Sequence, residues 1–66
     1  MNTMNPVLDA AINLSCGVLA TLTGRRLYSE LEEIQNAFVA FVISSGTRYE
    51  NWMQAWNDFW PQFNAA

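Results

Sequence analysis

The chain has 66 residues and a net charge of −3 at pH 7, and 52% of its residues are hydrophobic and 14% aromatic. It contains one cysteine, three arginines, no lysine and no histidine, so an internal disulfide and a Cys/His zinc site are excluded, and the commonest general base is missing. Three arginines against six acids also make non-specific binding to nucleic acid unlikely on electrostatic grounds, because that binding needs clustered basic side chains.

The length predicts a single domain, 1–66, with no strands, because no segment alternates polar and apolar residues. A chain this short buries only about 60% of the surface that its unfolded form exposes. The apolar content exceeds what three short helices can hide, so we expect a homodimer. The longest uninterrupted apolar run, 37–43, is too short for a membrane span. A lone cysteine and the lack of an export signal predict a cytoplasmic protein.

The first predicted helix covers 6–23. Asn5 is a favourable N-cap, Pro6 fits the first helical position, and Gly24 is placed to end the helix. The segment is apolar nearly all round, which predicts burial on several sides. Gly17 predicts a close contact between helices, and Cys16 reads as a small buried hydrophobic residue rather than a reactive thiol.

The second predicted helix covers 26–45, with a start between Arg25 and Ser29. Ser29 and Glu32 have the spacing of a capping box. The apolar residues follow the spacing that is typical of packed helix pairs. They are Leu27, Leu31, Ile34, Phe38 and Phe41.

The third predicted helix covers 48–60, and the segment 47–63 around it holds six of the nine aromatic residues. At about 100° per residue, its aromatic side chains fall on one face within an arc of roughly 120°. Thr47 and Glu50 predict a capping box at its start, and Pro61 predicts its end.

These patterns predict an all-α, three-helix domain and divide its apolar residues between a core and two contact surfaces. The expected core is Leu31, Ile34, Phe38, Phe41, Trp52 and Trp56. The expected dimer interface is Leu8, Ile12, Leu19, Phe38 and Val42. The expected partner-binding residues are Trp60, Phe63, Glu30 and Glu33, because tryptophan is enriched at binding hot spots and the acids lie near a helix start.

We expect no catalytic residues, no cofactor and no metal. The acids Glu30, Glu32 and Glu33 favour a solvated helix start over a divalent-ion site, since no second acidic segment would supply further ligands. The leading hypothesis is therefore a non-enzymatic adaptor or inhibitor that binds an unidentified protein. The alternatives are a nucleic-acid-binding regulator of helix-turn-helix type and an accessory subunit of a larger assembly.

The length, the MNTMNP start, the three-helix outline and the tryptophan-rich end resemble the small early proteins of lambdoid bacteriophages. These proteins are encoded between the exonuclease and excisionase genes. The resemblance implies a compact all-helical protein, dimeric, made early in infection and acting in the host cytoplasm on host physiology through protein contacts. It supplies no catalytic or binding residues.

Overall fold

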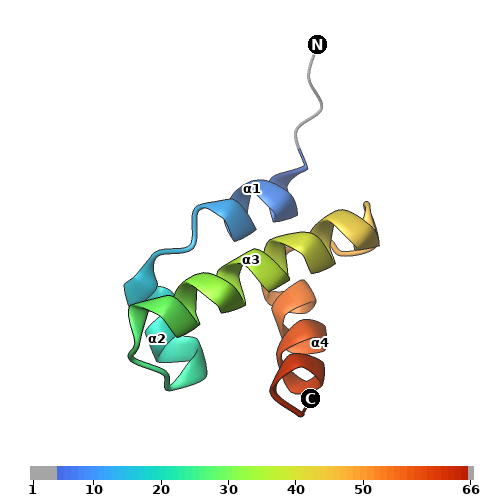
Figure 1. Ribbon diagram of the computed structural model, residues 1–66. Helices are drawn as coiled ribbons and strands as arrows, with labels where there is room; N and C mark the ends of the chain where they lie inside the picture. The colour runs from blue at the N-terminus through green and yellow to red at the C-terminus, as the bar shows by residue number, and fades with distance from the viewer. Residues whose placement is uncertain (1–4, 66) are drawn as a thin grey trace.

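The computed structural model describes residues 5–65, and this part of the chain is all helical (Figure 1). Its helices are α1 (Pro6–Ile12), α2 (Cys16–Thr23), α3 (Tyr28–Ser45) and α4 (Trp52–Ala65). The all-α class is confirmed. The described residues form four helices rather than three, because the segment predicted as one helix over 6–23 is divided.

The division between α1 and α2 is a bend of 95°. Two polar side chains hold it. Ser15 caps α2 by accepting a hydrogen bond from the backbone N–H of Val18 at 3.2 Å. Gln35 of α3 lies at the carboxyl end of α1, where its side-chain amide donates to carbonyl oxygens of the last helical residues and of the bend. The distances are 3.2 Å to Ala11, 3.0 Å to Ile12 and 2.9 Å to Leu14.

The amino end of α1 is also tied to α3. The Asn5 side chain accepts from the backbone N–H groups of Val7 and Leu8 at 3.0 and 3.3 Å, which confirms it as the N-cap. Its amide group donates to the carbonyl of Gly46 at 3.0 Å, directly after α3. Asn5 ties the start of α1 to the end of α3, and Gln35 ties the end of α1 to an earlier position in α3, so the two helices run antiparallel.

The bend overturns two expectations for this segment. Gly17 does not mark a close helix contact: it is exposed, and a methyl group there would lie at an ordinary 3.9 Å from Ser15 Oγ. Cys16 is exposed rather than buried, because it is the first residue of α2 at the bend. Gly24 does cap α2, with a left-handed φ of 75° that favours glycine.

The longest helix, α3, begins at Tyr28, inside the predicted range. Leu27 precedes it without a side-chain cap, so the expected Ser29–Glu32 capping box is wrong. The helix ends at Ser45, as the sequence predicts, and Gly46 turns the chain with a φ of 62°.

The last helix, α4, begins and ends four to five residues later than the predicted 48–60. Its start is set by Asn51, whose side chain accepts from the Gln54 N–H at 3.0 Å, while the Gln54 side chain accepts from the Glu50 N–H at 2.9 Å. The Thr47–Glu50 capping box is therefore wrong. Pro61 lies inside α4 and does not end it. Proline removes the hydrogen bond to the exposed Asn57 carbonyl, which water can satisfy.

The core surrounds α3, which contacts α1, α2 and α4. The buried residues are Val7, Ala11, Leu19, Leu31, Ile34, Phe38, Val42, Ala55, Trp56 and Phe59. At its centre the Phe38 ring meets Trp56 edge-on at 5.0 Å and Phe59 at 5.2 Å. Of the six expected core residues, four are buried, and Phe41 and Trp52 are half-buried against the same cluster.

Three residues expected at a dimer interface lie in this core. Leu19, Phe38 and Val42 are at most 1% exposed, so they are unavailable to a second chain. The bend lets α2 fold onto α3, and α4 covers Phe38 with its aromatic face. Leu8 is half-buried, and Ile12 is 56% exposed. The accessible surface is 4569 Å², close to the ~4,200 Å² expected for a folded monomer of this length.

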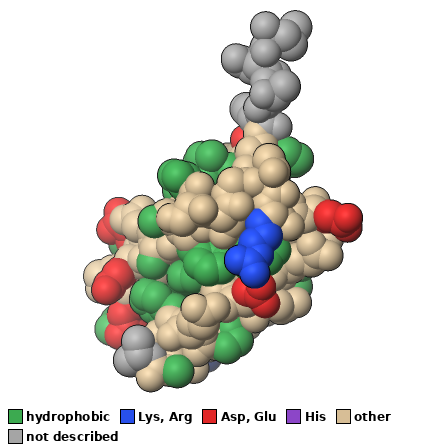
Figure 2. All heavy atoms as spheres, turned by 90° about the vertical axis from the view of Figure 1, so that its right-hand side faces the viewer, with side chains coloured by type: hydrophobic (Ala, Val, Ile, Leu, Met, Phe, Trp, Pro, Cys, Tyr) green, Lys and Arg blue, Asp and Glu red, His purple; other side chains and the backbone are tan. Residues whose placement is uncertain are grey.

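The large apolar side chains that stay exposed are spread over several elements. They are Ile12, Val18, Leu27, Tyr28, Ile43 and Met53. Figure 2 shows one face of the molecule, where hydrophobic side chains alternate with polar atoms and one arginine lies beside an acidic side chain. Within residues 5–65, no single helix is long and apolar enough to cross a membrane. Only α1 and α2 taken together reach that length and composition, with the 95° bend between them.

Candidate functional site: the Arg25 groove

A groove of about 380 Å³ lies between the loop that follows α2, the first half of α3 and the last turns of α4. We call it the Arg25 groove, after the side chain that crosses it. Its lining residues are Arg25, Glu30, Glu33, Ile34, Phe63 and Asn64. In the described chain α2 and α4 both pack on α3 without packing on each other, which leaves this space open between them.

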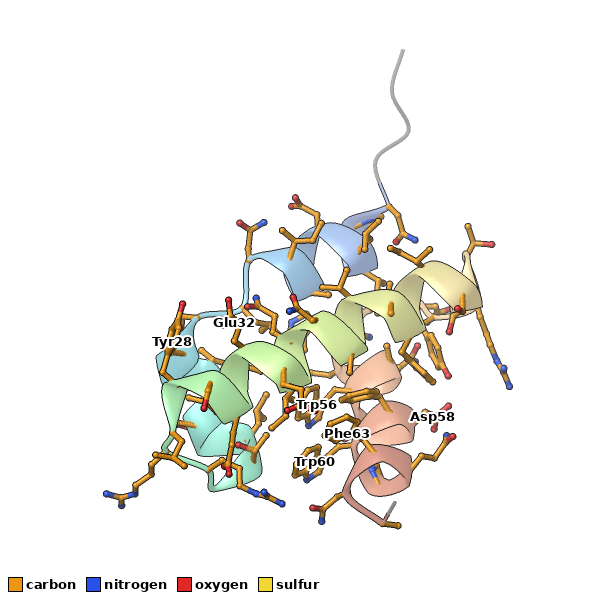
Figure 3. The ribbon with its side chains drawn as sticks, viewed as in Figure 1. Tyr28, Glu32, Trp56, Asp58, Trp60 and Phe63 are labelled. Carbon is orange, nitrogen blue, oxygen red and sulfur yellow. The ribbon has the colours of Figure 1, made fainter. Side chains whose placement is uncertain are left out.

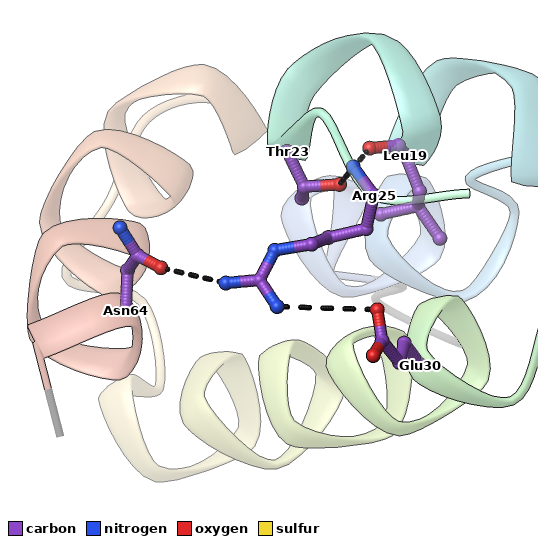
Figure 4. A network of polar contacts seen from close by, with 5 residues as sticks. All are labelled: Leu19, Thr23, Arg25, Glu30 and Asn64. Carbon is purple, nitrogen blue, oxygen red and sulfur yellow. Dashed lines mark hydrogen bonds and ion pairs between the residues drawn. The ribbon is translucent and has the colours of Figure 1, made fainter. Parts of the chain in front are cut away.

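The backbone of Arg25 is fixed by the end of α2. Its N–H donates to the Thr23 hydroxyl oxygen at 3.1 Å, and that hydroxyl donates to the Leu19 carbonyl at 2.7 Å (Figure 4). Because Gly24 takes the left-handed turn just before it, the Arg25 side chain leaves α2 in the direction of α3 and α4.

The Arg25 guanidinium bridges the two walls of the groove. It donates to the Asn64 side-chain oxygen of α4 at 3.0 Å, and its other terminal nitrogen lies 3.9 Å from a carboxylate oxygen of Glu30 in α3 (Figure 4). Its carbon also lies 6.0 Å from the centre of the Trp60 ring, at the outer limit of a cation–π contact. The Arg25 and Glu30 side chains are 46% and 43% exposed, so their ion pair contributes about 0–1 kcal/mol.

The α4 side of the groove continues into a stack of aromatic rings, of which Phe63 lines the groove itself. Trp60 stacks on Trp56 at 5.6 Å and on Phe63 at 6.0 Å, and Phe63 stacks on Phe59 at 5.3 Å. Figure 3 shows Trp56, Trp60 and Phe63 on one side of α4 and Asp58 on the other. Since Trp56 and Phe59 belong to the core, the half-buried Trp60 and Phe63 are held rigidly at its edge.

All four residues predicted to bind a partner meet at this groove. Glu30, Glu33 and Phe63 line it, and Trp60 contacts the Arg25 guanidinium. Glu32 does not join them, because it projects from the other side of α3, as Tyr28 does (Figure 3). The acidic residues near the start of α3 are thus divided between two faces.

Two groove residues are not among those predicted to bind a partner. Arg25 reads from sequence as a charge near a helix end, and Asn64 lies beyond the predicted limit at Pro61. A helix continued through Pro61 would have placed Asn64 one turn after Trp60, on the face of the aromatic residues.

The pKa of Tyr49, a residue outside the groove, is shifted by its neighbours. The Tyr49 hydroxyl donates to an Asp58 carboxylate oxygen at 2.8 Å, and this hydrogen bond raises the pKa of Tyr49 above its ordinary value of 10.0. Burial and the negative charge of Asp58 raise it further, while Arg48 acts in the opposite direction. Asp58 and the groove face opposite sides of α4 (Figure 3), so this pair serves the start of α4 rather than the groove.

The Arg25 groove therefore combines a rigid aromatic wall, two carboxylates and an exposed guanidinium, which suits the recognition of another surface. Comparisons with known protein families, with curated proteins and with solved structures find no match to this chain.

Proposed function

We propose that this protein is a non-enzymatic interaction protein that acts in the cytoplasm and binds a protein partner through the Arg25 groove. The observation that supports this proposal is the convergence of Glu30 and Glu33 with Trp60 and Phe63, two pairs far apart in sequence. Tryptophan and arginine are the side chains that most often dominate the energy of protein interfaces, and here a half-buried Trp60 lies beside the exposed Arg25 at the edge of the core. The resemblance to early proteins of lambdoid phages supports a host protein as the partner.

The alternative, a nucleic-acid-binding regulator, finds less support in the charge distribution. Arg25 and Arg26 precede α3, and Arg48 follows it. An 18-residue helix is about 27 Å long, so the three arginines do not form one basic patch. A gel-shift titration at about 50 mM salt compares the two functions, because electrostatic binding to nucleic acid is strongest at low salt.

Affinity capture with groove variants tests the proposed function. The tagged protein is used as bait, the captured protein is identified by mass spectrometry, and its affinity is then measured with purified components. Trp60→Ala and the charge reversal Glu33→Arg should each weaken binding at least about tenfold, which corresponds to a loss of about 1.4 kcal/mol.

Met53→Ala is the matched control, since Met53 is 41% exposed on α4 and does not line the groove. It should bind like the unsubstituted chain. Glu33→Arg changes an exposed side chain, so it separates loss of binding from loss of folding. Equal binding by the unsubstituted chain, Trp60→Ala and Glu33→Arg would remove the groove from the interaction.

The predicted homodimer is tested by light scattering through a dilution series. A mass of two chains that persists on dilution would require an interface outside the core, since Leu19, Phe38 and Val42 are buried. Leu8 and Ile12 would remain from the predicted set, and Ile12→Arg should then lower the mass to one chain. A constant mass of one chain would reject the dimer and leave the Arg25 groove fully open.

A further inference from the structure

We propose that the Arg25 groove recognises an arginine side chain of the protein partner, and that Arg25 holds the place of that side chain in the free protein. This inference rests on the proposed function and specifies its chemistry. The partner segment would insert its guanidinium between α3 and α4, and Arg25 would move aside.

The contacts of Arg25 show which chemical group the groove accommodates. Its guanidinium has a carboxylate of Glu30 on one side, an amide oxygen of Asn64 on the other and the face of Trp60 nearby. A guanidinium group is typically recognised by oxygen acceptors around the edge of its plane and by an aromatic ring against its face. The two acceptors come from different helices, so a fork of N–H donors spans them better than the compact ammonium of lysine.

The charge of the groove also favours a second cation. Glu30 and Glu33 supply two carboxylates and Arg25 supplies one guanidinium, which leaves an excess of one negative charge. Among residues 5–65, Glu30 forms an ion pair with Arg25, and Glu33 has no ion-pair partner. An anionic partner group would meet both carboxylates and be repelled. An arginine from a partner could bind Glu33 as well as the groups that Arg25 uses.

Arg25 is held weakly enough to be displaced. Its ion pair is long, at 3.9 Å, both side chains of the pair are nearly half exposed, and the ring contact is at the limit of its range. Its hydrogen bond to Asn64, at 3.0 Å, is exposed to solvent, where water can replace it. Arg25 belongs to the connection between α2 and α3, so its side chain can leave while the backbone stays bonded to Thr23. Resident and incoming guanidinium groups would compete for the same contacts.

Competition makes a prediction that simple charge attraction does not. N-acetyl-arginine amide is titrated into the isotope-labelled protein, and binding is followed at the Trp60 indole N–H and the Asn64 side-chain amide by nuclear magnetic resonance. Removing the competitor with Arg25→Ala should tighten binding at least about threefold, because the groove is then free in every molecule. Glu33→Gln should weaken binding.

Arg26→Ala is the matched control. It removes the same charge from the neighbouring position without emptying the groove, since Arg26 is not among the lining residues. It should therefore bind the probe like the unsubstituted chain. N-acetyl-lysine amide, as a second probe, should bind more weakly than the arginine probe.

Three results would overturn the inference. One is the absence of groove shifts in Arg25→Ala at about 50 mM probe, far above the millimolar range expected for a single side chain. Another is an equal gain in Arg25→Ala and Arg26→Ala, which would indicate net charge alone. The third is equal binding of the lysine probe. If a captured partner is still lost with Trp60→Ala, the proposed function stands and only the arginine assignment fails.

Discussion

Replacing Phe38 with alanine tests the centre of the fold most directly. Phe38 is 0% exposed and lies against the rings of Trp56 and Phe59 at 5.0 and 5.2 Å. Truncating a buried phenylalanine to alanine costs about 3–5 kcal/mol, because burial is lost and a cavity remains. A chain of this length is expected to have a free energy of unfolding of about 3–10 kcal/mol. Phe38→Ala should therefore remove a large part of the free energy of unfolding, and the folded state would be lost if that free energy lies at the lower end of the range.

The measurement is denaturant unfolding followed by far-ultraviolet circular dichroism and by tryptophan fluorescence. Ile43→Ala is the control on the same helix, since Ile43 is 61% exposed, and its effect should stay within about 0.5 kcal/mol. If Phe38→Ala has no folded baseline, Phe38→Leu gives a measurable transition, with a loss of about 1–3 kcal/mol from the two aromatic pairs. A loss below about 1 kcal/mol for Phe38→Ala would contradict its core position.

Two further predictions concern polar contacts. Gln35→Ala should lower the free energy of unfolding by about 1–2 kcal/mol, because the carbonyl groups at the end of α1 lose their hydrogen-bond donor. The measurement is a denaturant melt, with Gln62→Ala as the control because Gln62 is exposed. An unchanged free energy of unfolding would show that water replaces this contact. The raised pKa of Tyr49 means that folding favours its protonated form, so this contribution to stability is present below pH 10 and is lost as pH rises through the folded pKa. The variant Tyr28→Phe leaves Tyr49 as the remaining tyrosine, and its ultraviolet titration should have a midpoint above pH 10.0. Adding Asp58→Asn should lower that midpoint. If the midpoint is the same with and without Asp58→Asn, the role of Asp58 is refuted.

Local signals in the sequence predicted the fold class and most of the core. Leu31, Ile34, Phe38 and Trp56 are apolar residues at helical spacing, and this spacing is enough to predict which face of a helix is buried. The bend between α1 and α2 was missed because it depends on Gln35, a side chain about 20 residues away that supplies the donors for the end of α1. An apolar run with Asn13 and Ser15 inside it can equally form one helix.

The ends of α4 were misplaced for a related reason. The predicted start rested on Thr47 and Glu50, whereas Asn51 and Gln54 cap the helix four residues later. Pro61 is a strong local signal for a helix end, but the stacking of Phe63 on Phe59 and Trp60 stabilises a further helical turn after it. Glu30, Glu33, Trp60 and Phe63 were each predicted from sequence to bind a partner, without any prediction that they lie together. Their meeting around Arg25 depends on how α3 and α4 cross, which spacing does not encode.

The sparse attachment of α2 has a consequence for how the molecule opens. Within the described residues this helix packs on α3 alone and contributes one buried residue, Leu19, whereas α4 packs on both α1 and α3 and contributes three. Detaching α2 therefore exposes fewer buried apolar side chains than detaching α4, so α2 should open at a lower free energy than α4. Amide hydrogens of α2 should exchange with solvent before those of α3. Because Arg25 is bonded to Thr23 at the end of α2, each such opening also carries the resident guanidinium away from Glu30 and Asn64.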